Sequence, residues 1–451
     1  MKVLLVATNT LMEPYPVYPL GLDYVAGAIA GQHEVRIADL NNGDGYEGLK
    51  STINAFSPDI IGLSLRNIDN TDTTDPRGFI GQYQDLVKVI RSQSPAQLVL
   101  GGSGFTIFPA ETMQALGADF GVVGEGERLA PLLSALEENQ DTARLTGVIT
   151  KGGHADVPEP WDGDISNRLA PDMACRQFYL KNGGMLNLQT KRGCHFKCIY
   201  CTYPRIEGQR LRLTDPDAAA RAARELQESG AEYFFITDSV FNADIDHSLA
   251  VARAFKKYGV SLPWGAFFTP LKQPEDYFKV MAEAGLTHVE FGTDSLSNAV
   301  LKAYRKPFRD QLVFQVHQEA VDAGLYVAHY FLLGGVGEDK RTLAETLDKA
   351  DTLEKSALFF FCGMRIYPGT ELYRIALQEG QVQADSSILD PVFYRSPMIG
   401  SEEIVEKLHE KAAGRINWIT GSGGEDTADI IQRLYRRGHT GPMWEYLIRL
   451  S

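Results

Sequence analysis

The amino-acid sequence predicts an α/β protein that begins with a doubly wound parallel sheet, continues as a partial (β/α)6 barrel and ends in a helical segment. Two series of short apolar runs, each run separated from the next by a helix-like segment, indicate the two sheets. A polar stretch that carries Pro and Gly lies between the two series and has the composition of a linker. We therefore expect a sheet domain at residues 1–145, a linker at 146–183, a barrel at 184–395 and a helical domain at 396–451.

The first series contains five runs rich in Val, Ile and Leu, with helical spacing between them. The predicted strands lie at residues 2–7, 34–39, 59–65, 97–102 and 119–124. Continuous apolar strands that alternate with helices indicate a parallel sheet whose two faces are both covered. Such a sheet binds its ligands at the carboxyl ends of the strands.

The second series contains six apolar runs, and their spacing suits repeated strand–helix units. The predicted strands lie at residues 185–191, 232–237, 263–268, 288–293, 325–333 and 357–366. In a barrel of this kind the functional groups occupy the loops that follow the strands. The residues after each strand are therefore the first candidates for a site.

Composition and charge restrict the compartment and the partners. The 451 residues are 44% hydrophobic, which is enough for more than one core. No run of eighteen apolar residues occurs, and the opening MKVLLVATNT is unlike a signal peptide, so we expect a cytoplasmic protein without membrane contact. The net charge of −14 repels phosphate backbones, so we expect no nucleic-acid partner. A small-molecule substrate and a monomeric state complete these expectations.

Three of the five cysteines lie in the segment KRGCHFKCIYCTYP, which directly follows the first barrel strand. Three thiolates from one loop, Cys194, Cys198 and Cys201, can bind three irons of a [4Fe-4S] cluster and leave the fourth iron open to a substrate or cofactor. A zinc site that includes His195 or a remote residue is the first alternative. Buried thiols without a function are the second.

The CxxxCxxC spacing, its place after the first strand of a six-strand series and the aromatic Tyr200 before the last cysteine resemble the radical S-adenosylmethionine (SAM) superfamily. The resemblance implies that Cys194, Cys198 and Cys201 hold the cluster and that SAM chelates the open iron. It also implies that one electron, from a donor such as flavodoxin or ferredoxin, yields a 5′-deoxyadenosyl radical.

Further strand ends resemble the SAM-binding positions of this family. FFITDSVFN departs from the Gly-Gly-Glu pattern of many members and is similar to an acidic version in cobalamin-dependent members, while EFGTDS resembles the fourth-strand segment. The resemblance implies SAM contacts by Tyr200, Asp238, Ser239, Glu290, Asp294, Ser295 and Arg365. For each acid, helix capping or a solvated loop end is the alternative.

The doubly wound sheet ahead of the barrel resembles the cobalamin-binding domain of one branch of this superfamily, in PDIIGLSLRNIDN, VLGGSGFTIFPAETM and FGVVGEGE. The resemblance implies cobalamin contacts by Ser64, Leu65, Arg66, Asn67, Gly101, Gly102, Gly104, Gly124 and Glu125. The glycines among them would let the backbone approach a flat macrocycle.

The loop after the first strand, TNTLMEPYPVYPL, lacks the Asp-x-His-x-x-Gly motif that supplies a histidine ligand to cobalt in related domains. We therefore expect no histidine below the cobalt, with Arg66 near that position. A surface ion pair of Arg66 with Asp69 or another acid is the alternative.

The resemblance thus implies a cobalamin-dependent radical SAM methyltransferase that acts on an unactivated carbon, or on phosphorus, of a small natural-product-type molecule. His329, Tyr330 and Trp444 are candidates for lining its reaction cavity, with core or surface packing as the alternative. Two other functions stay open. One is a non-methylating radical reaction, such as rearrangement, cyclisation or 3-amino-3-carboxypropyl transfer from SAM, and the other is a non-catalytic cobalamin or redox sensor.

Overall fold

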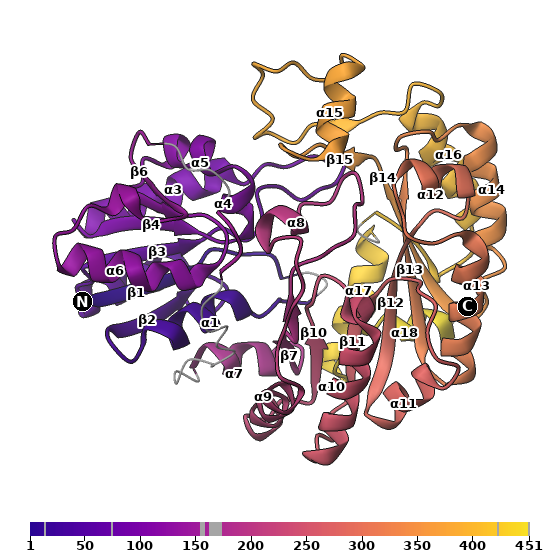
Figure 1. The fold of residues 1–451 in the computed structure, drawn as a ribbon, viewed down its shortest axis with the longest axis horizontal. Coiled ribbons are helices and arrows are strands. Elements are labelled where there is room, and N and C mark those ends of the chain that lie inside the picture. Colours follow the sequence, from indigo (N-terminus) through magenta and orange to yellow (C-terminus); the bar gives the residue numbers. More distant parts are fainter. Residues whose placement is uncertain (13–14, 74, 154–157, 162–173, 422–423, 450–451) are drawn as a thin grey trace. The chain divides into compact units, whose positions relative to one another are not determined.

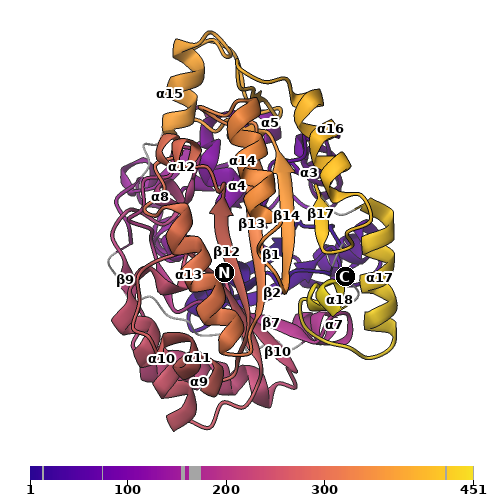
Figure 2. The same ribbon diagram turned by 90° about the vertical axis from the view of Figure 1, so that its right-hand side faces the viewer.

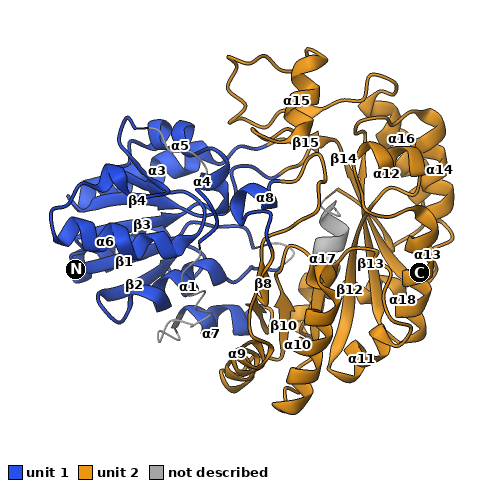
Figure 3. Ribbon diagram, in the orientation of Figure 1, with its two compact units in different colours: residues 1–70, 77–182, 202–210 blue, residues 71–76, 183–201, 211–451 orange. Residues whose placement is uncertain are grey.

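A computed structural model describes residues 1–12, 15–73, 75–153, 158–161, 174–421 and 424–449 of the chain (Figures 1 and 2). Contacts between residues divide the chain into two compact units (Figure 3). Unit 1 comprises residues 1–70, 77–182 and 202–210, and unit 2 comprises residues 71–76, 183–201 and 211–451. Much of the predicted linker, at 154–157 and 162–173, lies outside the described residues.

Unit 1 contains a six-stranded sheet in the order β2-β1-β3-β4-β5-β6, and the five predicted strands are all present. Neighbouring strands are parallel except for β6, which runs antiparallel to β5. The sequence analysis missed β6 because three residues are too short to show an apolar pattern. The strands are β1 (Lys2–Ala7), β2 (Glu34–Asp39), β3 (Ile60–Ser64), β4 (Gln97–Gly101), β5 (Phe120–Val122) and β6 (Val148–Thr150).

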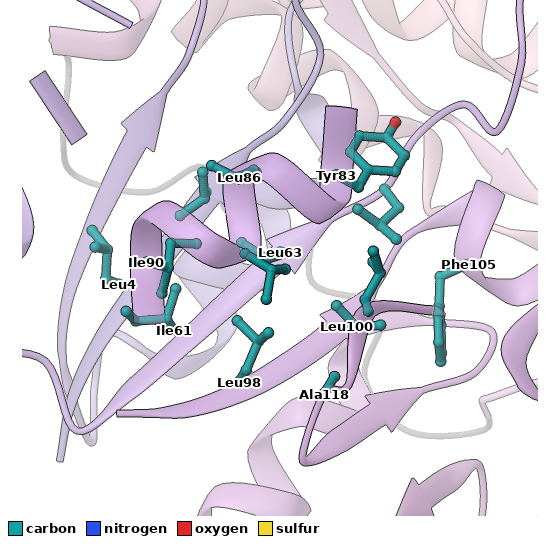
Figure 4. Packing of buried hydrophobic residues seen from close by; sticks show 14 of the residues in the cluster. Leu4, Ile61, Leu63, Tyr83, Leu86, Ile90, Leu98, Leu100, Phe105 and Ala118 are labelled. Atoms are coloured by element: carbon teal, nitrogen blue, oxygen red, sulfur yellow. The ribbon is translucent and has the colours of Figure 1, made fainter. Parts of the chain in front are cut away.

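Helices cover both faces of this sheet, as the continuous apolar strands predict. Leu4 and Val6 of β1 pack into one core with helices α2, α3 and α5, whereas Val3 and Leu5 pack into a second core with α1 and α6. Figure 4 shows the first core around Leu63 and Leu100. The helices of unit 1 are α1 (Leu20–Ile29), α2 (Tyr46–Phe56), α3 (Ile80–Gln93), α4 (Ser103–Ile107), α5 (Pro109–Leu116), α6 (Leu129–Glu137), α7 (Ala174–Lys181) and α8 (Tyr203–Ile206).

Unit 2 contains a seven-stranded parallel sheet in the order β17-β14-β13-β12-β11-β10-β7. Six of these strands correspond to the predicted barrel series. The C-terminal segment is helical as predicted but also adds β17 at the edge of the sheet, which the sequence analysis did not anticipate. The strands are β7 (Met185–Leu188), β10 (Tyr233–Ile236), β11 (Trp264–Phe268), β12 (Leu286–Asp294), β13 (Tyr326–Leu333), β14 (Ser356–Cys362) and β17 (Trp418–Thr420).

The two faces of this sheet are covered differently. Helices α12, α13, α14 and α16 pack on one face through Leu301, Val313, Leu343 and Ile404 (Figure 2). On the opposite face, which we call the inner face, α18 and the residue before it pack through Leu447 and Trp444. The helices of unit 2 are α9 (Pro216–Glu228), α10 (Ile245–Lys257), α11 (Tyr277–Glu283), α12 (Asn298–Ala303), α13 (Asp310–Asp322), α14 (Lys340–Ala350), α15 (Glu371–Gln378), α16 (Ser401–Ala412), α17 (Gly424–Arg436) and α18 (Glu445–Arg449). Among the described residues, none of the helices combines the length and the apolar composition that a bilayer-spanning segment needs.

A buried ion pair joins the start of the cysteine loop to the end of β10. Lys191 lies in the short strand β8 (Lys191–Arg192), which pairs with β9 (Arg212–Leu213). Its Nζ donates to Asp238 Oδ2 at 2.8 Å and to the carbonyl of Phe241 at 2.6 Å, and both charged side chains are fully buried. Asp238 also accepts from the backbone N–H and the hydroxyl of Thr190. The carboxylate therefore fixes the chain immediately before the cysteines.

Replacing Asp238 by alanine would leave the Lys191 ammonium buried without its carboxylate. We expect Asp238→Ala to lower the free energy of unfolding by about 3–5 kcal/mol, measured by urea denaturation of the metal-free protein. The matched control is Glu283→Ala, which breaks the Lys256–Glu283 pair of the same 2.8 Å length, in which both side chains are about half exposed. That change is expected to cost less than about 1 kcal/mol. Equal losses in the two variants would contradict the assignment.

Candidate functional site

The three clustered cysteines lie in a loop of unit 2 that backbone hydrogen bonds hold in place. Cys194 is buried, and Cys198 and Cys201 are half-buried. The N–H of Ile199 donates to the carbonyl of Tyr304 at 3.2 Å, and the Ile199 carbonyl accepts from the N–H of Leu372 at 2.8 Å. The loop is thus attached to two separate segments of the unit, so its thiols have defined positions.

Beside these thiols lies a polar group formed by Tyr200, Asp294 and Lys306. The Tyr200 hydroxyl donates to Asp294, and Lys306 Nζ lies 2.9 Å from Asp294 Oδ2 in a nearly buried pair. Asp294 is the last residue of β12 and has a φ of 62°, a left-handed conformation that few non-glycine residues adopt. The strand end is therefore bent at the residue that carries the acid.

Charge and burial oppose one another at Cys198. Burial raises the pKa of the Cys198 thiol, while the nearby Lys306 ammonium acts to lower it. Burial would lower the pKa of Lys306, but Asp294 and Cys198 outweigh this effect and raise it. A cation that stays charged beside thiolates favours metal ligation by sulfur, since the thiolate is the ligand form. The sequence analysis missed Lys306, which stands in no recognisable motif.

Within the described part of the chain, no group of three or more His, Cys, Asp or Glu residues is arranged to hold a single metal ion. A zinc site needs its ligands to converge on one ion. In a [4Fe-4S] cluster each cysteine binds a different iron, so the thiols do not share one centre. The donor set therefore fits a cluster and lends no support to the zinc alternative.

Four of the predicted SAM contacts hold the protein's own backbone or side chains. Asp238 is occupied as described above, and the Ser239 hydroxyl donates to the carbonyl of Gly193 at 3.0 Å. The Ser295 hydroxyl is fully buried against Thr346. The Arg365 guanidinium donates to the carbonyls of Ile366, Val392, Ile388 and Leu389. Of the predicted set, Tyr200 and Asp294 are the residues that the structure brings beside the cysteines, and SAM contact by any of them stays a prediction.

Glu290 lies on the inner face of the sheet among aromatic side chains. Its two oxygens accept from Trp444 Nε1 and from the Tyr330 hydroxyl, each at 2.9 Å. Burial raises the pKa of this carboxyl to about 7, although the two hydrogen bonds act to lower it. Tyr330 stacks on Phe359 at 4.8 Å between ring centroids, and the neighbouring Phe267 is 39% exposed. The inner face thus presents a titratable acid in a wall of partly exposed rings.

His329 has a different place from its neighbour Tyr330. Its ring is fully buried, bonds to Thr293 and His317, and stacks on Phe291. Burial lowers its pKa well below the usual value. His329 is therefore a core residue, which was the alternative to a role in lining the cavity. Tyr330 and Trp444, in contrast, lie beside Glu290.

In unit 1 the residues predicted to contact cobalamin gather at the carboxyl ends of β3, β4 and β5. A Cβ at Gly102 would meet the Leu65 carbonyl oxygen at 2.7 Å, and one at Gly104 would meet it at 2.9 Å. Gly102 also has a φ of 97°. These two glycines are therefore required by close packing of the 65–67 backbone, a reason independent of any macrocycle.

The other residues of this set are held by the unit itself, with the exception of Arg66. The Ser64 and Asn67 carbonyls accept from Thr8 and Tyr83, and Glu125 accepts from the N–H of Trp161. Gly124 has a φ of 81°, whereas a Cβ at Gly101 would meet only ordinary contacts.

The Arg66 side chain is exposed, and within the described residues its guanidinium makes no hydrogen bond or ion pair. The alternative pairing with Asp69 is therefore not found. Desolvation by the surrounding protein lowers the pKa of Arg66, and the phenols of Tyr203, Tyr15 and Tyr179 act in the opposite direction. The Arg66 guanidinium is therefore surrounded by protein on most sides, but part of it remains accessible to solvent. A cation available to a ligand, at strand ends without a histidine, fits the expected cobalamin site.

Comparison with known proteins identifies a cofactor-binding domain in each part of the chain. The sequence model of the radical SAM superfamily matches residues 188–350, and that of the B12 binding domain matches residues 12–134. The cytidylyl-2-hydroxyethylphosphonate methyltransferase of Streptomyces wedmorensis is 25% identical over 445 residues, covering 83% of this chain and 80% of that protein. The tryptophan 2-C-methyltransferase of Streptomyces laurentii is 22% identical over 429 residues, covering 78% and 71%.

Solved structures share the fold of the whole chain. The radical S-adenosylmethionine methyltransferase TsrM from Kitasatospora setae, with tryptophan substrate and a SAM analogue bound, superposes with a TM-score of 0.88. It is 23% identical, and the match covers 99% of this chain and 98% of that one. The cobalamin-dependent S-adenosylmethionine radical enzyme OxsB superposes with a TM-score of 0.75 at 14% identity, covering 100% and 70%.

A radical SAM domain with its three-cysteine loop and a B12-binding domain thus occur in one chain. Its cofactors are a [4Fe-4S] cluster, SAM and cobalamin. The protein is therefore an enzyme of the radical SAM superfamily, in the branch that carries an N-terminal B12-binding domain.

Proposed function

We propose that this enzyme transfers a methyl group from SAM, by way of cobalamin, to an unactivated carbon or to phosphorus of a small natural-product-type molecule. The observation that carries the proposal is the presence of both cofactor domains in one chain whose relatives include two methyltransferases. One relative is named for a phosphonate substrate and the other for tryptophan, so both small acids and aromatic rings are substrate classes to test.

The residues of each unit have distinct tasks in this proposal. When bound, the cluster and SAM supply a 5′-deoxyadenosyl radical and cobalamin supplies a transferable methyl group. Cys194, Cys198 and Cys201 would hold three irons of the cluster, and Tyr200 and Asp294, which lie beside these thiols, would contact SAM. Lys306 balances the negative charge of the thiolates. Arg66, exposed after β3, would be available to cobalamin at the strand ends that would hold it.

In this proposal the substrate binds against the inner face of the unit 2 sheet. Phe267, Tyr330 and Phe359 offer partly exposed rings that exclude water around a radical, and Glu290 is the acid among them. A carboxyl with a pKa near neutrality accepts or returns a proton at working pH. The electron donor and the substrate itself are proposed only as classes, a reduced flavodoxin or ferredoxin and a small metabolite.

Product analysis with methyl-labelled SAM tests the function. The protein is reconstituted without oxygen, supplied with cobalamin and dithionite, and its SAM-derived products are measured by mass spectrometry. We expect S-adenosylhomocysteine that requires cobalamin, and 5′-deoxyadenosine that is lost in Cys198→Ala because that variant cannot hold the cluster. Methylthioadenosine as the main product would instead indicate aminocarboxypropyl transfer, and the absence of any cleavage would indicate a sensor.

Replacing Lys306 by methionine removes a buried positive charge near the cluster ligands. Because reduction adds an electron, we expect the cluster potential to become more negative by on the order of 50–100 mV, measured by redox titration with electron paramagnetic resonance. Lys306→Arg should retain the potential. Lys302→Met, on the exposed side of α12, is the matched control and should leave it unchanged. A potential in Lys306→Met equal to that of the wild type would contradict the role of Lys306.

Glu290 predicts a pH dependence of stability. Its pKa is about 7 in the folded protein and about 4.3 in the unfolded chain, so the unfolded state loses its proton first as the pH rises. The contribution of Glu290 to the free energy of unfolding is therefore fully present below about pH 4. It falls by up to about 3 kcal/mol as the pH rises toward about 7.

The variant Glu290→Gln lacks this titration. We expect the free energy of unfolding of Glu290→Gln, relative to the wild type, to increase between about pH 4.5 and 7 and then to stay level. Urea denaturation across this range measures it, with the exposed Glu406→Gln as control. Parallel pH profiles for the wild type and Glu290→Gln would contradict the assignment.

A further inference from the structure

Two arginines of unit 1 have no hydrogen-bonding or charged partner among the residues that the structure describes. Arg205 lies in α8, and Arg66 follows β3. Within the described residues neither guanidinium forms a hydrogen bond or an ion pair. The Nε atom of Arg205 is buried and lacks an acceptor. A buried guanidinium nitrogen without an acceptor costs free energy of desolvation, and this applies to Arg205, whereas the Arg66 side chain is exposed.

Three other buried or half-buried arginines of the same unit have hydrogen-bond partners, although the Nε atom of Arg128, like that of Arg205, has no acceptor among the described residues. Arg176 pairs with Asp23 at 3.2 Å, and Arg91 pairs with Asp119 at 2.7 Å. Arg128 donates to the carbonyls of Thr146 and Glu159. Burial lowers the pKa of Arg205, and no carboxylate opposes it. Within the described residues, Arg205 and Arg66 therefore differ from these three arginines in that the guanidinium makes no hydrogen bond or ion pair.

Helix α4 contacts both segments that carry these arginines. The hydroxyl of Ser103, the first residue of α4, donates to the Arg66 carbonyl at 2.8 Å. Helix α8 packs against α4, and the Ile206 carbonyl oxygen lies 3.9 Å from the position of a Cβ on Gly124. The phenol of Tyr203, the first residue of α8, acts electrostatically on Arg66. Both residues therefore lie at the carboxyl edge of the sheet, near the ends of β3, β4 and β5.

We propose that Arg205 and Arg66 form an oxyanion-binding site in unit 1, for a phosphate, phosphonate or carboxylate group. A planar guanidinium binds such groups through two parallel N–H donors. Neutral acceptors would satisfy the hydrogen bonds but would leave the positive charge of the partly buried Arg205 without a counter-ion. The anion has two chemical sources, the phosphodiester of cobalamin or an anionic group of the substrate. The site does not depend on methyl transfer as the reaction.

Binding measurements on the full chain distinguish the two sources. Isothermal titration is performed with hydroxocobalamin, with cobinamide, which lacks the phosphodiester, and with methylphosphonate added to the cobalamin-loaded protein. The variants are Arg205→Met, Arg205→Lys and, as the matched control in the same segment, the exposed Arg210→Met. Circular dichroism checks that each variant is folded.

If the phosphodiester is the ligand, Arg205→Met should weaken cobalamin binding about tenfold to a hundredfold and leave cobinamide binding unchanged. If a substrate anion is the ligand, both corrinoids should bind normally and methylphosphonate binding should be weakened by a similar factor. Arg205→Lys should recover part of the loss in either case. The proposal is overturned if Arg205→Met binds all three probes as the wild type does, if both corrinoids are weakened equally, if Arg210→Met shows the same losses, or if the wild type binds neither anion.

Discussion

The buried contact between Lys191 and Asp238 is the constraint on which the arrangement of the cysteine loop depends. Both charges are removed from water, so the pair persists only while its geometry and its added hydrogen bonds to Thr190 and Phe241 are complete. This requirement couples the end of β7 to the end of β10 immediately before the first cysteine. The same loop is then attached to Tyr304 and Leu372 at its far end. Its thiols are therefore held by the framework of unit 2 rather than by a metal alone.

The periodicity of the sequence predicted the strands because burial on both sides of a parallel sheet leaves a continuous apolar run, as in β1 with Val3 and Leu5 on one side and Leu4 and Val6 on the other. It did not predict β6 or β17, because three-residue strands are below the length at which a pattern is visible. Both strands form through pairing with a neighbour that is distant in sequence.

Motif spacing located the cysteines, but the roles of other polar residues depend on partners that the sequence does not reveal. Asp238 resembles a ligand-binding acid, and the sequence does not reveal that it is the ion-pair partner of Lys191. The sequence predicts that Gly102 and Gly104 leave space for a cofactor. Their close packing against Leu65 requires glycine at both positions whether or not a cofactor binds. Lys306 carries no motif, and its importance follows from its distance to Asp294 and its effect on Cys198. Tertiary contacts, rather than local propensity, assign these residues.

The packing of the C-terminal segment on the inner face has a consequence for how the chain is made. Glu290 and the rings around it are synthesised well before Trp444, which donates to Glu290 and covers part of this face. A nascent chain that has already paired β7 to β14 would still expose aromatic surface and a half-satisfied acid. Such surface promotes aggregation until it is covered. The interval between translation of β14 and of α18 is thus a vulnerable period, during which chaperone contact would protect the growing polypeptide.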